Sequence, residues 1–146
     1  MFENTSLLYI CTILEAIEKI EIYAHSFDNG WELMEANDQM NFNAINRLLL
    51  TIGEESKKIE QGLLNLQPQI NWNAIIGLRN RMAHDYRGID PEIVFDIIRT
   101  ELGPLKSALV YLLPNFSISK DDLDLVLSSS YFKHIRYISG YLQITR

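Results

Sequence analysis

The most informative stretch of the chain runs Trp72-Asn73-Ala74-Ile75-Ile76-Gly77-Leu78 and continues as Arg79-Asn80-Arg81-Met82-Ala83-His84-Asp85-Tyr86. Its first half is apolar enough to be buried, and its second half gathers two guanidinium groups, a carboxamide, an imidazole and a phenol. A guanidinium presents a planar fork of donors that matches a phosphate. An imidazole takes or gives a proton near neutral pH. This set of groups suits chemistry at a phosphodiester without a metal ion.

Helical geometry limits how these side chains meet one phosphate. On a helix over residues 71–84, Asn80 and His84 lie ~40° apart on one face, whereas Arg79 and His84 diverge by ~140°. A regular helix therefore does not aim Arg79 and His84 at the same anion. Either the helix breaks near Ala83, or two copies of the chain meet and build a composite site; we favour the second.

The flanking segments predict an all-α protein. Apolar residues recur at three- and four-residue steps along 5–25 and 41–66, and a largely buried third helix over 71–84 begins at the capping residue Asn71. A fourth helix starts at Asp90-Pro91-Glu92, where Asp90 caps and Pro91 takes the first position. We expect Gly103-Pro104 to interrupt this helix and Pro114 to end it.

Two further segments are less regular. Residues 26–40 are rich in turn formers, and we expect Trp31 and Met34 to dock back on the core as one helical turn. Residues 115–146 form a C-terminal extension. Ser119 marks its helix start, and the apolar spacing continues as far as Ile138. His134 is interpreted as a surface or interface residue.

Individual residues in the first two helices also carry predictions. Cys11 lies on the apolar stripe, which is typical of a small buried hydrophobe. Gly53, in the middle of a helix, indicates close approach of another backbone. The neighbouring Glu54 is a candidate partner for Arg79 or His84, the alternative being a solvated helix carboxylate. Ser56 is the polar residue on that helix's apolar seam.

The composition bounds the class of function. The chain has 146 residues, 47% hydrophobic and 22% charged, as in a soluble globular domain. The net charge of −6 argues against a protein that coats nucleic acid, which needs a basic surface. A local basic cleft formed by Arg79, Arg81 and Arg87 is compatible with that charge.

No apolar run reaches the ~20 residues that cross a bilayer. The start, Met1-Phe2-Glu3-Asn4, lacks the basic and apolar regions of a secretion signal, and a single cysteine excludes an internal disulfide. We therefore expect a cytoplasmic protein. No Cys, His and carboxylate cluster has the spacing of a metal site, so we expect no metal and no cofactor.

The motif resembles that of the HEPN superfamily, specifically its HepT-like toxin branch. The pattern of an Arg, a polar neighbour, four intervening positions, a His, one position and a Tyr falls on Arg79, Asn80, His84 and Tyr86. The resemblance covers roughly residues 5–113 and extends to three further stretches: Ile52-Gly53-Glu54, Arg87-Gly88-Ile89-Asp90 and Leu102-Gly103-Pro104-Leu105. Typical chains of this branch end near that point, whereas this one adds about thirty residues.

The resemblance implies a HEPN-type up-down four-helix bundle over residues 1–114, with an additional C-terminal helix in 115–146 packed on the same domain. It also implies a homodimeric, metal-independent endoribonuclease toxin whose antitoxin, a minimal nucleotidyltransferase, attaches AMP to Tyr86. Arg79, Asn80 and His84 are then the catalytic residues, in a cleft across the dimer axis. Glu54, Arg81 and Asp85 support them, and RNA is the substrate.

Two other interpretations remain open at this point. The chain could be a non-catalytic helical subunit that binds a nucleotidyltransferase and presents Tyr86 for modification. Alternatively, Arg79, His84 and Asp85 could form a surface ion-pair cluster that caps a buried helix and has no chemical role.

Overall fold

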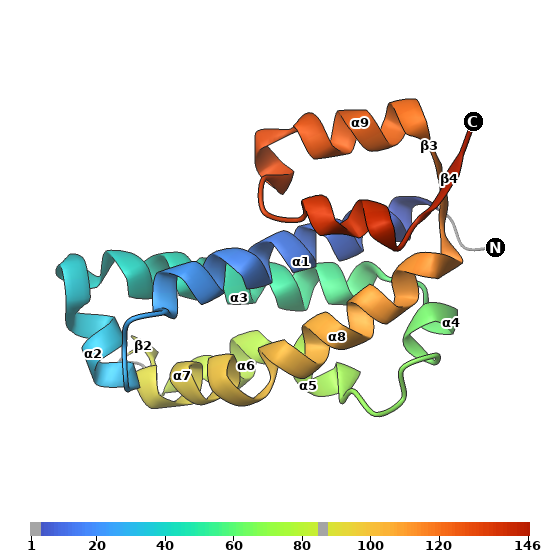
Figure 1. Cartoon of the computed structure of the whole chain (residues 1–146). Coiled ribbons are helices and arrows are strands. Elements are labelled where there is room, and N and C mark those ends of the chain that lie inside the picture. The colour runs from blue at the N-terminus through green and yellow to red at the C-terminus, as the bar shows by residue number, and fades with distance from the viewer. Residues whose placement is uncertain (1–3, 85–87) are drawn as a thin grey trace.

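The computed structural model describes residues 4–84 and 88–146, apart from the His84 side chain, and most of this part of the chain is helical. Four rods form the body, namely α1 (Asn4–Ala24), α3 (Met40–Lys58), the pair α5 (Trp72–Ile76) and α6 (Leu78–Met82), and the pair α7 (Pro91–Thr100) and α8 (Leu102–Leu112) (Figure 1). Short helices make the connections: α2 (Gly30–Glu35) with the 3-10 turn η1 (Ala36–Gln39), and α4 (Gln61–Leu64). The predicted all-α bundle is confirmed.

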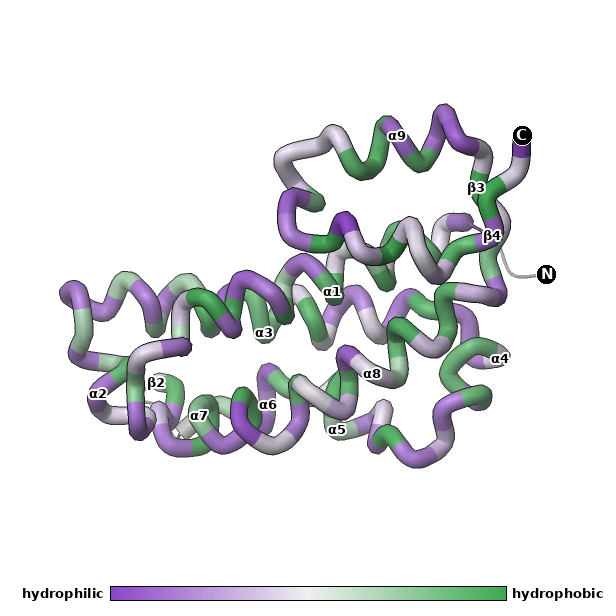
Figure 2. Tube along the Cα trace, in the orientation of Figure 1, coloured by the Kyte–Doolittle hydropathy of each residue, from purple (hydrophilic) through white to green (hydrophobic). Residues whose placement is uncertain are grey.

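The core is built around α1, whose apolar stripe is buried along the whole helix. Hydrophobic and hydrophilic residues alternate along each rod in Figure 2, as expected for helices that bury one face. Cys11 is 1% exposed, which confirms it as a buried small residue, and burial raises the pKa of its thiol to about 12. None of the described helices is both long and apolar enough to span a membrane.

The predicted helix starts are confirmed because each depends on a local hydrogen bond. The Asn71 side chain accepts from Ala74 N at 3.1 Å, and the Asp90 side chain accepts from Glu92 N at 2.9 Å with Pro91 next in sequence. Ser119 Oγ accepts from Asp122 N at 3.1 Å. Such side-chain acceptors satisfy backbone N–H groups that the first turn of a helix leaves unpaired.

Several helix ends differ from the predictions. α3 ends at Lys58 rather than at residue 66, because Ile59 adopts an extended conformation (φ −67°, ψ 139°) that buries its side chain. The third rod breaks at Gly77 and ends at Met82, with Ala83 extended (φ −64°, ψ 135°). The expected interruption of the fourth rod is confirmed, and it falls at Glu101, just before Gly103-Pro104.

The 26–40 segment forms α2 and η1, and its docking residue differs from the one expected. Trp31 is 54% exposed, so the prediction that it docks on the core is wrong. Leu33 is buried in its place, and Met34 packs partly against the core. The reason is that Gly30 and Leu33, three positions apart, share the face of α2 that contacts α7.

The C-terminal extension is not one continuing helix. It follows the turn η3 (Leu113–Asn115) and comprises α9 (Lys120–Ser128), the 3-10 turns η4 (Ser130–Phe132) and η5 (Arg136–Gly140), and strands β3 (Ser117–Ser119) and β4 (Gln143–Thr145), which pair in parallel. The expected helical spacing to Ile138 fails because serine side chains compete for the backbone. Ser128 Oγ donates to Leu125 O, and Ser129 Oγ accepts from Tyr131 N.

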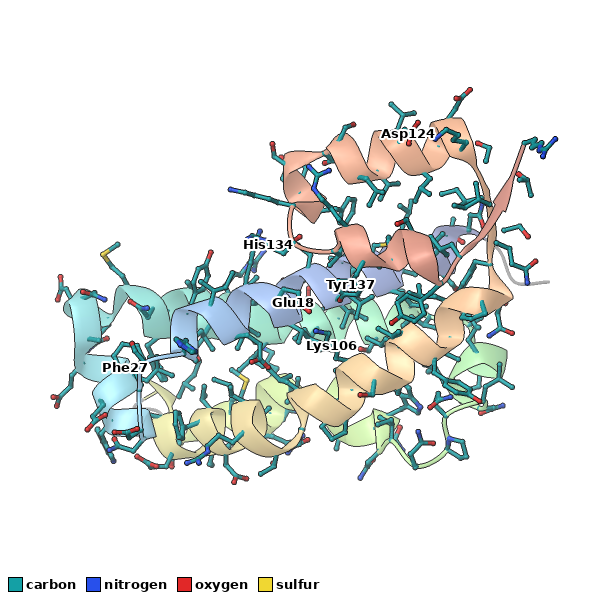
Figure 3. All side chains as sticks on the ribbon, viewed as in Figure 1. Glu18, Phe27, Lys106, Asp124, His134 and Tyr137 are labelled. Carbon is teal, nitrogen blue, oxygen red and sulfur yellow. The ribbon has the colours of Figure 1, made fainter. Side chains whose placement is uncertain are left out.

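A partly buried polar cluster holds the extension against α1 (Figure 3). Glu15, 3% exposed, accepts from His134 N at 2.6 Å, and His134 Nδ1 lies 2.5 Å from its other oxygen. The Tyr137 hydroxyl donates to Glu18, which also pairs with Lys106 Nζ at 2.6 Å. Burial and Glu18 raise the pKa of Tyr137. His134 therefore lies at the interface between the extension and α1.

Two glycines set how closely the rods approach. A Cβ at Gly53 would lie 3.1 Å from Ile75 O and 3.3 Å from Ile76 O, which confirms the predicted backbone contact between α3 and α5. A Cβ at Gly30 would lie 2.1 Å from Pro91 O. These contacts position α5 and the start of α7 without intervening side chains.

Arg81 ties the third rod to the fourth. Its Nη1 donates to Ala74 O at 3.1 Å and to Glu101 Oε1 at 2.9 Å, and its Nη2 donates to Glu101 Oε2. The hydrogen bond to Glu101 raises the pKa of Arg81. This bidentate pair joins α6 to the junction between α7 and α8, and we call it the Arg81–Glu101 clamp.

Gly30→Ala is expected to lower the free energy of unfolding by about 2 kcal/mol or more, because the added methyl group would overlap the Pro91 carbonyl. Gly103→Ala is the matched control, since nothing lies within 4 Å of a Cβ there and alanine favours a helix. Urea unfolding followed by circular dichroism measures both variants. Equal free energies of unfolding would contradict this packing.

We expect the Arg81–Glu101 clamp to contribute a coupling free energy of about 1 kcal/mol. A bidentate pair is stronger than a single ion pair, but solvent screens this one because both side chains are partly exposed. A double-mutant cycle with Arg81→Met and Glu101→Gln measures it. The exposed Lys58–Glu55 pair, at 3.0 Å within α3, serves as the control cycle and should give a smaller coupling. A clamp coupling no larger than that control would show that the pair does not hold α6.

Candidate functional site

α6 presents two motif residues to solvent. Leu78 and Met82, four positions apart, are both fully buried and fix one side of the helix against the core. Arg79 and Asn80 lie on the opposite side and are exposed. The packing of α6 therefore leaves a guanidinium and a carboxamide next to each other on the surface.

The chain leaves α6 in an extended conformation and carries His84 in a short strand. β1 (Ala83–His84) pairs antiparallel with β2 (Gly88–Ile89), with Ala83 opposite Ile89 and His84 opposite Gly88. Asp90 N donates to Met82 O at 3.0 Å and closes the same turn. Gly88 has φ 119°, which favours glycine. The helix thus breaks at Ala83, which was the less favoured of the two geometries considered from the sequence, and the backbone of His84 is held next to the end of α6.

The supporting residues have different outcomes. Arg81 points away from Arg79 and is engaged in the Arg81–Glu101 clamp, so its charge is balanced by a carboxylate. Glu54 is exposed on α3, and within the described residues no hydrogen bond or ion pair joins it to Arg79. Asp85, Tyr86 and Arg87 lie outside the described residues.

Asn46 is a buried polar residue of α3 that was not expected from the sequence. It is 7% exposed, and its Oδ1 has no hydrogen-bond partner among the described residues. It precedes Gly53 by seven positions, so it lies on the same face of α3, the face that contacts the third rod. A buried unpaired acceptor is uncommon. The signal available in the sequence was an asparagine one position beside the apolar seam at Ile45.

The charges at the motif favour an anion. Arg79 has no ion pair within residues 4–84 and 88–146, so its guanidinium is available to a ligand. In the same described part of the chain, no group of three or more His, Cys, Asp or Glu could hold a metal ion. Arg79 can therefore bind a phosphate as a fork of donors, with the Asn80 carboxamide beside it.

Arg79 and Asn80 are exposed at the protein surface. Four surface pockets with volumes of about 250 to 930 Å³ lie elsewhere, and their linings include neither Arg79 nor Asn80. A phosphate bound by one copy of α6 would stay in contact with solvent. Stabilisation of developing charge is stronger where water is excluded.

Comparisons with known proteins place this geometry in a family. A model of the "Ribonuclease HepT-like" family matches residues 13–112, a range that includes α6 and β1. A Thermococcus cleftensis protein named as a probable ribonuclease HepT is 31% identical over 67% of this chain and 86% of its own length.

Relatives from Methanocaldococcus jannaschii are named as candidate RNases. One is 36% identical over 42% of this chain and 50% of its own length, and another is 33% identical over 48% and 64%. No solved structure gives a significant match to the chain. By its family match and its similarity to these relatives, the chain belongs to the ribonuclease HepT-like family of the HEPN superfamily.

Proposed function

We propose that this protein is a metal-independent endoribonuclease and the toxin of a toxin–antitoxin pair. The observation that carries the proposal is that Arg79 and Asn80 are exposed side by side on α6. The strand that contains His84 follows directly after this helix, and the chain belongs to a ribonuclease family. The cationic fork replaces a metal ion as the group that neutralises the scissile phosphate.

The proposed reaction is an attack within the RNA strand. Arg79 holds the phosphate, and His84 removes the proton from the ribose 2′-hydroxyl. The 2′-oxygen forms a bond to phosphorus as the bond to the 5′-oxygen breaks, which leaves a 2′,3′-cyclic phosphate. The leaving 5′-oxygen takes a proton from an imidazolium, and Asn80 orients either the imidazole or the ribose.

A second copy of the chain would complete the site. Because Arg79 and Asn80 are exposed, a facing α6 would exclude water and place the His84 of one copy opposite the Arg79 of the other. Trp31, at 54%, and Ile93, at 37%, are exposed on α2 and α7 at the end of the bundle where β2 lies (Figure 1). We propose that these two apolar side chains take part in the contact with the second copy.

One observation favours the alternative of a non-catalytic subunit that binds a nucleotidyltransferase. The Arg81–Glu101 clamp balances one of the two motif guanidinium charges, and the whole chain carries a net charge of −6. Both features weaken non-specific attraction to RNA. In either case the proposed partner is a minimal nucleotidyltransferase that attaches AMP to Tyr86.

The purified protein is expected to cleave single-stranded RNA in EDTA and to leave cyclic phosphate ends. His84→Ala should reduce the rate by about 100-fold or more, the usual contribution of a general base. Gel analysis of a labelled RNA, with mass spectrometry of the ends, measures both. His25→Ala is the matched control, because His25 is exposed on the bundle surface and should be dispensable.

RNA cleavage by His84→Ala at the wild-type rate would contradict the proposed chemistry. An absence of cleavage by the wild-type protein on diverse RNAs, with a retained complex with the nucleotidyltransferase, would favour the non-catalytic alternative. Loss of activity in His25→Ala as well would indicate a folding defect rather than a chemical role.

Co-expression with the cognate nucleotidyltransferase is expected to add whole AMP units to the intact mass and to abolish RNA cleavage. Tyr86→Phe should prevent the mass increase, because the phenol oxygen that accepts the nucleotide is absent. Tyr131→Phe is the control, since Tyr131 is 81% exposed and equally available to a non-selective transferase. AMP retained by Tyr86→Phe would show that another residue is the acceptor.

A further inference from the structure

The loop before α5 forms a pocket that the proposed chemistry does not use. Its volume is about 460 Å³, and the residues that line it are Gln61, Pro68, Gln69, Ile70, Asn71, Trp72 and Asn73. We call it the amide pocket. In the described part of the chain, no charged side chain contributes to its lining.

The chemistry of the amide pocket fits a nucleobase. Each carboxamide offers both an acceptor and two donors, which match the edges of bases. An aromatic ring offers a face on which an unstacked base of single-stranded RNA can stack. A phosphate, by contrast, is best held by cations, which this lining lacks. The ligand class is therefore an uncharged planar heteroaromatic ring.

The pocket is pre-organised by hydrogen bonds. The Trp72 indole N–H is shared between Leu64 O and Gln67 O, each at 3.1 Å, so the ring is held in one orientation. Asn71 Oδ1 accepts from Ala74 N at 3.1 Å, and Gln69 Nε2 donates to the buried Gln67 at 2.6 Å. Groups fixed in this way lose little entropy when a ligand binds.

The same bonds leave capacity for a ligand. The Asn71 amide N–H groups and Gln69 Oε1 are not consumed by the contacts above. The Asn73 side chain is exposed and makes no hydrogen bond within residues 4–84 and 88–146. Asn73 is therefore the lining group most available to read a base.

The amide pocket lies on the rod that carries the catalytic motif. Asn73 precedes Asn80 by seven positions along this rod, which breaks at Gly77 between them. Both are exposed, and α5 and α6 follow one another along one edge of the bundle (Figure 1). An RNA strand whose phosphate lies at Arg79 can reach the pocket with a neighbouring base.

We propose that the amide pocket is a base-recognition subsite of the RNA substrate and that Asn73 sets its base preference. This inference rests on the proposed ribonuclease function. Under this proposal, the amide pocket selects the cleavage site, and Arg79 and His84 carry out the chemistry.

Fluorescence of Trp72 tests the pocket without any cleavage. A Trp31→Phe, His84→Ala protein keeps Trp72 as its single tryptophan and is titrated with short oligonucleotides of A, C, G or U. We expect saturable quenching that favours one base by at least about fivefold, as for one good amide–base pair. Asn73→Ala should remove that preference, whereas Asn43→Ala, an exposed asparagine on α3, should keep it.

Quenching that does not depend on the base, or a preference that survives Asn73→Ala, would overturn the proposal. If the nucleotidyltransferase changed the fluorescence of Trp72 and no oligonucleotide did, the proposal would also be overturned, and the pocket would be identified as a protein-docking surface. Circular dichroism shows whether Asn73→Ala is folded. If it is not, Gln69→Ala replaces it in the same fluorescence titration.

Cleavage mapping separates this proposal from the proposed function. With an active nuclease, Asn73→Ala should redistribute the cleaved positions on a mixed-sequence RNA while the summed rate changes by less than about threefold. An unchanged cleavage pattern would reject the subsite and leave the nuclease intact. No cleavage by the wild-type protein would reject the proposed nuclease, while base-selective quenching of Trp72 would still support the pocket.

Discussion

The position of the candidate site depends on the close contact between α3 and α5 at Gly53. A Cβ at this position would lie 3.1 Å from Ile75 O and 3.3 Å from Ile76 O, so the absence of a side chain lets the two helices approach closely. The third rod is thereby held against the core on one side over both of its short helices. Its other side, from Asn73 to Asn80, faces solvent. Burial of one face decides which motif residues remain available for a ligand.

The two arginines of α6 illustrate how this constraint divides tasks. Arg81 is turned toward the fourth rod, where Ala74 O and Glu101 satisfy its donors. Arg79 is turned outward and lacks an ion pair in the described part of the chain. One guanidinium thus fixes the helix, and the other remains free to bind an anion. In the proposed function, Arg79 and the adjacent strand that carries His84 form a half-site that a second copy closes.

Local signals in the sequence were sufficient for the parts of the fold that short-range bonds determine. The caps at Asn71, Asp90 and Ser119 were predictable because each needs only residues two or three positions away. The ends of α3 and α9 were not, because they depend on burial of Ile59 and on bonds made by neighbouring serines. Long-range pairs such as Glu15 with His134, 119 positions apart, leave no local pattern.

The same division applies to the candidate site. The residue types and spacing led to a set of predicted site residues whose roles stay predictions, and the break at Ala83 was the less favoured of the two geometries considered. The partner of Arg81 and the buried acceptor of Asn46 were not predictable, because both depend on which helices meet.

The most direct measurement of the central claim, a site shared by two copies, is RNA cleavage by a refolded mixture of Arg79→Ala and His84→Ala proteins. In such a mixture, roughly half of the dimers contain one copy of each variant. If each site takes its arginine from one copy and its histidine from the other, these dimers keep one intact site, and the mixture should regain activity. A mixture no more active than its separate components would contradict a shared site.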